Sequence, residues 1–402
     1  MRRTHRILLT LTLMLLASAL TCLILALTLG RELGLFNDRF MDIREYAALL
    51  RRIDETYIGD PDRNEVTASA LRAAVLSLGD RWSYYLTSEE YEEYINSSNN
   101  RYTGIGVTAS VDEETGGIEI QSIYKDSAAS NAGLAVGDII TGVDGVSVIG
   151  TDLEAFRVLL SRQIGETAIL TIIREAAGTL DIIVEYGYVF VDPVEYELLE
   201  GSVGYIALMN FDGGSGERFI EAVDQLIETG ATSLIFDVRG NGGGRVSEMT
   251  MILDYLLPEG DIFVAVDKEG SEEIIVSQPD SIDIPSAVLI NRHSYSAAEY
   301  FAATLSEYEY SVTFGQQTTG KSRSQMTYRL PNGGAIHIST GQYLTKNRVS
   351  LYDTGGLTPD NIILMTDEED ELWALGRLSY EDDPQLTAAL DFLRIATDAP
   401  VN

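Results

Sequence analysis

The stretch "SLIFDVRGNGGG", Ser233 to Gly244, is an apolar strand-like segment followed by a turn that contains three consecutive glycines. Glycine adopts backbone conformations that other residues avoid, so such a turn exposes N–H groups where a side chain would block approach. Upstream, "SVGYIAL" (202–208) is strand-like and "GERFIEAVDQLIETG" (216–230) is an amphipathic helix. Further apolar runs occupy 262–266, 287–290 and 335–338. Strands that alternate with helices predict an α/β core.

The segment before this core has a different periodicity. In "MDIREYAALLRRIDETYI" (41–58) the apolar residues recur at spacings of three and four, and "EVTASALRAAVLSLGD" (65–80) repeats the pattern. These spacings predict helices, and we expect a helical region over residues 31–101. From Tyr102 the pattern changes to short strands and turns.

The first thirty residues form a separate segment. Ile7 to Leu29 is a 23-residue stretch without a charged residue, which is long enough to span a bilayer. "SALTC" resembles a lipoprotein cleavage site, but the apolar run continues past Cys22, which favours an uncleaved anchor. Arginines at 2, 3 and 6 precede the span, so we expect the N-terminus in the cytoplasm and everything after Gly30 outside it.

Composition excludes several kinds of site. The net charge of −34 argues against nucleic-acid partners, which need a basic surface. Cys22 is the only cysteine, so the part beyond the span has no disulfide, thiolate metal site or cysteine nucleophile. No metal and no cofactor are implied. The chain has few lysines, Lys125, Lys268, Lys321 and Lys346, and lysine, unlike arginine, can lose its proton near neutral pH.

The stretch "NRHSYSAAEYFAATL" (291–305) predicts a strand, a tight turn and a helix beginning near Ser296. A serine there lies at the positive end of the helix dipole, and the N–H of Ala297 can stabilise an oxyanion. The alternative is ordinary N-capping, for which serine is a preferred residue. His293 lies three residues before the serine, whereas a triad base normally comes from another part of the fold. We therefore interpret His293 as framework.

A second polar stretch, "GQQTTGKSRSQMTY" (315–328), contains Lys321 with Gln325 four residues later. Residues four apart share a face in a strand or a helix, so Gln325 can orient the lysine amine. A lysine acts as a base only when burial or nearby positive charge lowers its pKa. The alternative is an ordinary surface lysine.

Between the helical region and the core, residues 102–186 resemble a PDZ domain. The resemblance depends on "GIGV" (104–107), "SAASNAGLAVGDII" (127–140) and "VDGVSV" (143–148), in that order. It implies that Ile105, Gly106 and Val107 form the loop that binds a peptide carboxylate, with the next strand edge pairing with the peptide. The alternative is that the glycines only shape a strand entry. We predict a PDZ domain at 102–190 and a peptidase core at 191–402.

The motifs "DVRGNGGG", "SYSAAE" and "TGKSRSQ" behind a PDZ-like module resemble the carboxyl-terminal processing (tail-specific) peptidases, S41-type Ser/Lys endopeptidases with a crotonase/ClpP-like α/β core. The likeness extends from about Met41 to Ala396 and includes "LGDRWSYYLTSEEY" and "GGLTPDNI". The site residues that the resemblance implies are Ser296 as nucleophile, Lys321 as general base, Gln325 as its orienting partner, and Ala297 with Gly243 (or Gly244) as oxyanion-hole donors. The chain departs from the pattern at Gly242, where the family usually has proline, and at Tyr295, Ala298 and Arg323.

By this resemblance the chain is a serine endopeptidase of the cell membrane, single-pass, with its catalytic part extracytoplasmic. It would recognise apolar C-terminal tails of proteins through the PDZ domain and cleave through an acyl-enzyme. A homodimer is implied by family likeness alone. Two alternatives stay open, a catalytically inactive PDZ scaffold and a crotonase-like acyl-CoA enzyme.

Overall fold

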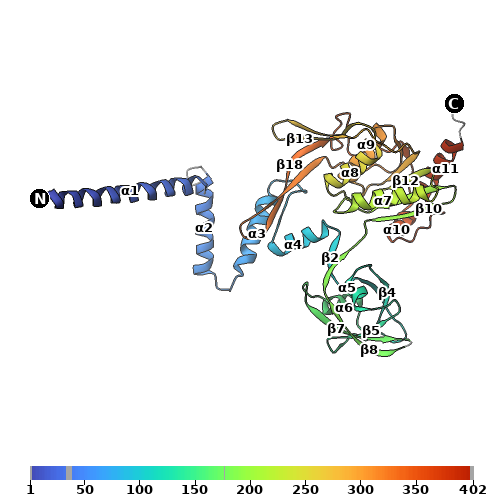
Figure 1. Ribbon diagram of the computed structural model, residues 1–402, viewed down its shortest axis with the longest axis horizontal. Coiled ribbons are helices and arrows are strands. Elements are labelled where there is room, and N and C mark those ends of the chain that lie inside the picture. The colour runs from blue at the N-terminus through green and yellow to red at the C-terminus, as the bar shows by residue number, and fades with distance from the viewer. Residues whose placement is uncertain (1, 33–38, 176, 399–402) are drawn as a thin grey trace. The chain divides into compact units, whose positions relative to one another are not determined.

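The computed structural model describes residues 2–32, 39–175 and 177–398 (Figure 1). The chain divides into two compact units, residues 1–70 and 71–402. Helices α1 (Arg2–Glu32) and α2 (Arg39–Thr56) lie in the first unit, and α3 (Arg63–Leu76) begins there. Within α1, Leu11–Leu29 has a mean hydropathy of 2.3. A helix of this length and composition fits a membrane anchor or a signal sequence.

A small β-rich module lies within the second unit. Its strands pair in the order β3-β4-β5-β7-β8, with β6 on β5. The elements are β3 (Val107–Val111), β4 (Ile118–Ile123), α5 (Ala128–Ala132), β5 (Ile139–Val143), β6 (Val146–Ser147), α6 (Leu153–Leu159), β7 (Thr167–Arg174) and β8 (Gly178–Glu185). Before and after the module, β2 (Arg101–Gly104) and β9 (Gly187–Phe190) pair antiparallel, so the two connections to the rest of the chain run side by side.

The second large element is a six-stranded sheet with the order β10-β11-β12-β15-β16-β19. Its strands are β10 (Val194–Leu199), β11 (Val203–Leu208), β12 (Ser233–Asp237), β15 (Ser286–Ile290), β16 (Ser311–Gly315) and β19 (Asn361–Ile362). Only β10 runs antiparallel to its neighbour among the described strands of this sheet. The associated helices are α7 (Ser215–Glu228), α8 (Val246–Leu256), α9 (Ala297–Glu307) and α11 (Pro384–Asp398).

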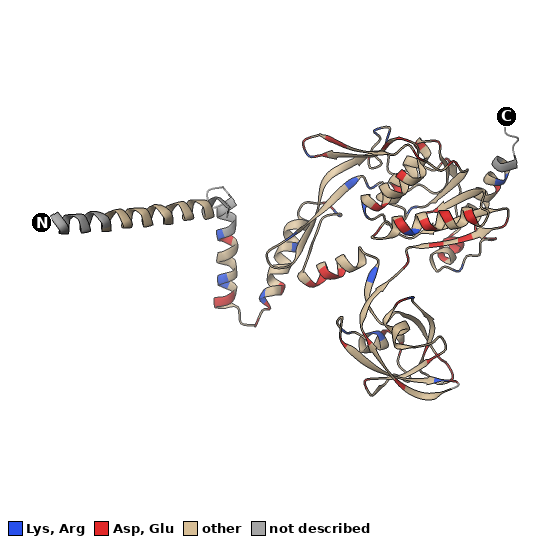
Figure 2. Ribbon diagram, in the orientation of Figure 1, with Lys and Arg blue, Asp and Glu red and all other residues tan. Residues whose placement is uncertain are grey.

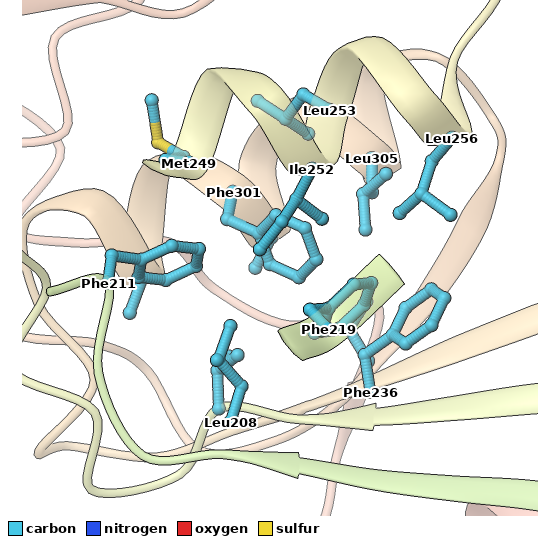
Figure 3. Close-up of a cluster of buried hydrophobic side chains, with 14 of the residues drawn as sticks. Leu208, Phe211, Phe219, Phe236, Met249, Ile252, Leu253, Leu256, Phe301 and Leu305 are labelled. Atoms are coloured by element: carbon cyan, nitrogen blue, oxygen red, sulfur yellow. The ribbon is translucent and has the colours of Figure 1, made fainter. Parts of the chain in front are cut away.

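Helices cover both faces of this sheet, because successive strand residues point to opposite sides. On β12, Phe236 packs in one cluster with Phe219 of α7, Ile252 of α8 and Phe301 of α9 (Figure 3). Its neighbour Ile235 packs in another cluster with buried leucines of α11. Parallel strands buried on both faces leave the carboxyl ends of the strands as the place for a site.

A five-stranded antiparallel sheet completes the unit, in the order β1-β18-β13-β14 with β17 on β18. The bounds are β1 (Tyr84–Leu86), β13 (Gly260–Asp267), β14 (Glu272–Ser277), β17 (Arg323–Arg329) and β18 (Ala335–Leu344). The two remaining helices of the unit are α4 (Ser88–Ser97), which follows β1, and α10 (Asp367–Ala374), which follows β19. Figure 2 shows Asp and Glu recurring along α4 and α7, as expected for solvated helix surfaces. The predicted α/β core is confirmed.

Candidate active site

Ser296 lies in the turn between β15 and α9, immediately before the first residue of the helix. Its backbone has φ 61° and ψ −125°, a conformation that is costly for a residue with a side chain and that recurs at catalytic turns. Ser296 is 9 % exposed and lines a cavity of about 640 Å³. Ala297 begins α9, so its N–H has no acceptor within the helix, and it lines the same cavity.

Two neighbouring polar residues hold this turn in place. The Ser294 hydroxyl donates to the Val238 carbonyl at 2.7 Å and accepts from the Asn291 N–H at 3.0 Å. The Asn291 side chain accepts from the N–H of Gly240 at 3.0 Å. The turn is thereby fastened to the loop after β12. The His293 ring is exposed, with Arg292 Nε at 3.1 Å from its Nε2.

The glycine loop passes directly beside the serine. A Cβ built on Gly243 would lie 2.7 Å from Ser296 Cβ and 2.9 Å from the nitrogen of Ala297, so only glycine permits this approach. The Gly243 N–H, however, donates to Asn241 Oδ1 at 2.8 Å. Gly244 lines the cavity and has a φ of 148°. The loop therefore brings Gly243 against Ser296, with its N–H already engaged, while Gly244 lines the same cavity.

Gly242, which departs from the family pattern, lies next to Tyr295, which departs from it as well. A Cβ on Gly242 would lie 2.6 Å from the hydroxyl oxygen of Tyr295, which is closer than real contacts allow. The Tyr295 side chain thus occupies the space beside residue 242. The two departures, at 242 and 295, are complementary.

Lys321 lies in the loop between β16 and β17 and lines the same cavity as Ser296. Burial lowers the pKa of Lys321 from 10.5 to about 8; Glu299 and Asp80 act against this shift, and Arg81 adds to it. Its amine lies 4.4 Å from the centroid of the Trp82 ring. A substantial share of this lysine is therefore neutral near pH 8, which a general base requires.

Glu299, to which the sequence analysis gave no role, connects the serine to the lysine. Its carboxylate accepts from the N–H groups of Ser296 at 2.9 Å, Lys321 at 2.8 Å and Gly320 at 2.6 Å, and from the Thr318 hydroxyl. It is fully buried, and burial raises its pKa while these hydrogen bonds oppose the rise. The spacing Ser-x-x-Glu is the capping-box signature, which is the signal that indicates Glu299.

Gln325 lines the cavity but its amide points to other partners. The amide nitrogen donates to the Arg323 carbonyl at 2.9 Å and to the Ser339 hydroxyl at 3.1 Å. The hydrogen bond to Lys321 that the four-residue spacing predicts is absent from the contacts of the described residues. Lys321 precedes β17, and the pairing with β18 shifts register between Ser324 and Gln325, so the two residues do not share one regular strand face.

Two residues of β18 complete the surroundings of the lysine. The Tyr343 hydroxyl donates to the Lys321 carbonyl and lies within hydrogen-bonding reach of the Ser296 side chain. His337 lines the cavity and stacks on Tyr84 with ring centroids 4.8 Å apart. Burial, with a contribution from the Lys321 charge, lowers the pKa of His337 to about 4, so His337 is neutral at physiological pH.

A second cavity, of about 590 Å³, lies in the β-rich module between residues 102–109 and helix α6. Ile105, Gly106 and Val107 line it, together with Leu153, Phe156 and other residues of the helix region. The carbonyls of Ile105 and Gly106 accept bonds from the N–H groups of residues 129 and 124, and β3 is an end strand of its sheet. An open strand edge beside an apolar groove is the geometry for adding a peptide strand.

Comparisons with known proteins agree with this organisation. Residues 202–363 match the profile of peptidase family S41, and residues 119–174 match that of the PDZ domain. The chain is a serine-type peptidase whose residues 202–363 match family S41. Its PDZ match falls on the β-rich module, and its peptidase match includes Ser296 and Lys321.

Relatives of this peptidase carry names that describe carboxyl-terminal processing. The chain is 27 % identical over 343 residues to the carboxy-terminal processing protease CtpA of Bacillus subtilis, covering 84 % of this chain and 73 % of that one. It is 28 % identical over 348 residues to the carboxyl-terminal-processing protease of a Synechocystis strain, covering 84 % and 80 %. A structure assigned to the S41 proteases, from Bacteroides fragilis, has a TM-score of 0.52 at 18 % identity, covering 85 % and 94 %, which is a likeness of fold.

Proposed function

We propose that this chain is an endopeptidase in which Ser296 is the nucleophile and Lys321 the general base. The observation that carries the proposal is the shared support of the two residues. One buried carboxylate, Glu299, accepts from the backbone N–H of both, and both side chains line one cavity. A serine in a strained turn at a helix N-terminus, beside a lysine with a pKa of about 8, is suited to acyl transfer.

The neutral Lys321 amine takes the hydroxyl proton as Ser296 Oγ attacks the scissile carbonyl carbon. The resulting ammonium gives that proton to the leaving amine when the peptide C–N bond breaks, and an acyl-enzyme remains on Oγ. Water then attacks the ester, again with Lys321 as base, and releases the acid and the free serine. Because the base must be neutral, kcat/KM is expected to rise with pH through about 8.

The oxyanion that forms during attack would accept from the Ala297 N–H and from one N–H of the glycine loop. Since the Gly243 N–H donates to Asn241, Gly243 becomes available only when Asn241 releases it, and Gly244, which lines the cavity, is the alternative donor. Gln325 would orient Lys321 only after its amide leaves the Arg323 carbonyl. The orienting role of Gln325 stays a prediction.

We also propose that the PDZ groove at Ile105, Gly106 and Val107 binds apolar C-terminal tails of substrate proteins. The apolar side chains of α6 that line the groove and the names of the relatives support this. The test compares one folded substrate protein with an apolar tail and the same protein with a charged tail. Equal cleavage rates for the two would contradict tail recognition.

The remaining proposals concern architecture and location. The parts are an anchor (1–30), a helical region (31–101), a PDZ domain (102–190) and a peptidase core (191–402) with a crotonase/ClpP-like fold. The apolar helix α1 would hold the protein in the cell membrane with the catalytic part outside the cytoplasm, and a homodimer is consistent with the family. Digestion of the catalytic part by protease added to the cells tests its location. Light scattering of the purified protein tests its oligomeric state.

The central experiment uses an active-site probe with two variants. A fluorophosphonate is expected to label the wild type but not Ser296→Ala, and Lys321→Arg is expected to lose turnover while remaining folded. Lys346→Arg is the matched control, because the Lys346 amine also lies over an aromatic ring, at 3.7 Å from the Tyr308 centroid, but outside the cavity. Full activity of Lys321→Arg would refute the Ser/Lys mechanism. Absent labelling of the wild type would favour an inactive scaffold, and acyl-CoA turnover would favour the crotonase-like alternative.

A further inference from the structure

The Lys321 amine lies against an indole ring that comes from a distant part of the chain. Its nitrogen is 4.4 Å from the centroid of the Trp82 ring, within the range of about 6 Å at which an aromatic face attracts a cation. The Arg81 guanidinium carbon lies 4.1 Å from the same centroid. The Trp82 ring in turn lies 5.6 Å from the ring of Tyr295, the residue before the nucleophile.

The segment that carries Trp82 is bonded to strands β17 and β18. Asp80 accepts from the Trp82 N–H at 3.2 Å and the Ser83 hydroxyl at 2.6 Å, and pairs with Arg323 at 3.5 Å. The Ser83 hydroxyl accepts from the Ser339 N–H of β18 at 3.0 Å. These bonds fix the indole on the same framework that holds Lys321, so the contact is built into the fold. Asp80, Trp82 and Ser83 all belong to the motif "LGDRWSYYL" (78–86), which has no role in the acyl-transfer steps proposed above.

We propose that Trp82 is a positioning residue whose indole face holds the Lys321 amine at the cavity wall beside Ser296. The inference rests on the proposed function, because it takes Lys321 as the base. A lysine amine on a flexible four-carbon side chain needs a fixed partner if it is to stay in one place. The indole supplies one without accepting a hydrogen bond, so the amine can still give and take protons.

The contact also affects the charge of the amine, because an aromatic face stabilises the ammonium more than the neutral amine. It therefore acts together with Glu299 and Asp80, which favour the charged form, and against burial and Arg81, which favour the neutral form. His337, which also lines the cavity, is neutral in the relevant range. Weakening the negative face of the indole should lower the pKa of Lys321 and move the acid limb of kcat/KM to lower pH.

A simple Trp82→Leu variant would not isolate this effect, since the smaller side chain admits water and water raises the pKa of a lysine. Fluorinated tryptophan avoids the problem, because fluorine withdraws electron density from the ring face with little change in size. The chain has two tryptophans, so a Trp373→Phe protein carries the analogue only at position 82. A series with increasing ring fluorination should move the acid limb stepwise downward, by up to about one pH unit in all.

The matched control is the Trp82→Phe protein with the same analogues at Trp373, in which fluorination should not move the acid limb. If Trp373→Phe fails to fold, the labelled wild type replaces it, and the difference from the control gives the same quantity. An acid limb that stays in place or moves upward, in an enzyme that Lys321→Arg inactivates, would overturn the role of Trp82 and leave the proposed function intact. Activity retained in Lys321→Arg would instead defeat the proposed function itself.

Discussion

Replacing Glu299 with glutamine is expected to reduce catalysis while the protein remains folded. The carboxylate accepts four hydrogen bonds, two on each oxygen, whereas an amide offers one oxygen and one NH₂ group. In the better orientation the amide oxygen faces Ser296 and Lys321. The Thr318 hydroxyl then turns to accept from the amide NH₂, so the Gly320 N–H and the Thr318 hydroxyl hydrogen lose their acceptor. One unsatisfied buried N–H costs about 1–3 kcal/mol, and removing a carboxylate whose pKa burial already raises offsets part of that.

The effect on activity follows from the geometry of the two supported residues. Neutral hydrogen bonds are longer than those to a carboxylate, so the Ser296 turn and the Lys321 loop should shift relative to each other by some tenths of an ångström. A misplacement of about 1 Å can cost about 10²-fold in rate, so a shift of some tenths of an ångström should cost roughly 10-fold in kcat/KM. Because Glu299 raises the pKa of Lys321, the residual activity should have its acid limb at lower pH than the wild type.

The assay is cleavage of a fluorogenic peptide across pH, together with urea unfolding. Glu307→Gln is the matched control, because Glu307 lies on the same helix and accepts from the Thr345 hydroxyl at 2.6 Å and the Asn347 N–H at 2.9 Å, away from the cavity. A modest loss of stability is expected for both variants, but a loss of kcat/KM only for Glu299→Gln. A Glu299→Gln enzyme as active as Glu307→Gln would show that the shared carboxylate does not set the geometry of Ser296 and Lys321.

Three further outcomes are expected. Gly242→Ala should lower activity, since its Cβ would meet the Tyr295 hydroxyl at 2.6 Å, and adding Tyr295→Ala should restore part of it; additive losses in the double mutant would contradict the steric argument. Arg239→Met should cost about 3–5 kcal/mol in urea unfolding, because it leaves two buried aspartates, at 2.6 and 2.8 Å, without their partner; wild-type stability would refute this. Lys321→Met should be more stable than wild type by about 3 kcal/mol at pH 7, since the folded pKa is about 8 against 10.5. That gain should be complete below pH 8 and should disappear as the pH rises towards 10.5, and a gain independent of pH would count against the lowered pKa.

Much of the fold and part of the site could be predicted from the sequence. Alternating strands and helices predicted the α/β core because burial on both sheet faces leaves long apolar runs, as at 234–236. The helix start at Ser296 was readable from small residues followed by an apolar face. The scarcity of lysine indicated each of the four lysines, Lys321 among them, as a candidate base on chemical grounds. The structure places these two residues in one cavity, although they are separated by a helix and a strand.

Contacts that depend on how distant segments meet could not be predicted in the same way. The spacing between Lys321 and Gln325 assumes one regular strand, but the lysine precedes the strand and a register shift follows it. His337 lines the cavity, and β1 pairs with β18 so that Tyr84 lies opposite it. Pairing between strands about 250 residues apart has no local signature, so no periodicity in either segment predicts it.

The departures from the family pattern illustrate why residues taken singly mislead. At position 242 a glycine suggests a looser loop than a proline would give, and at 295 a tyrosine suggests a more crowded turn. In the structure the tyrosine hydroxyl fills the space beside the glycine, and its ring lies next to Trp82, whose indole contacts Lys321. The glycine at 242 therefore does not loosen the site. It makes room for an aromatic pair that extends from the turn of the nucleophile to the proposed base.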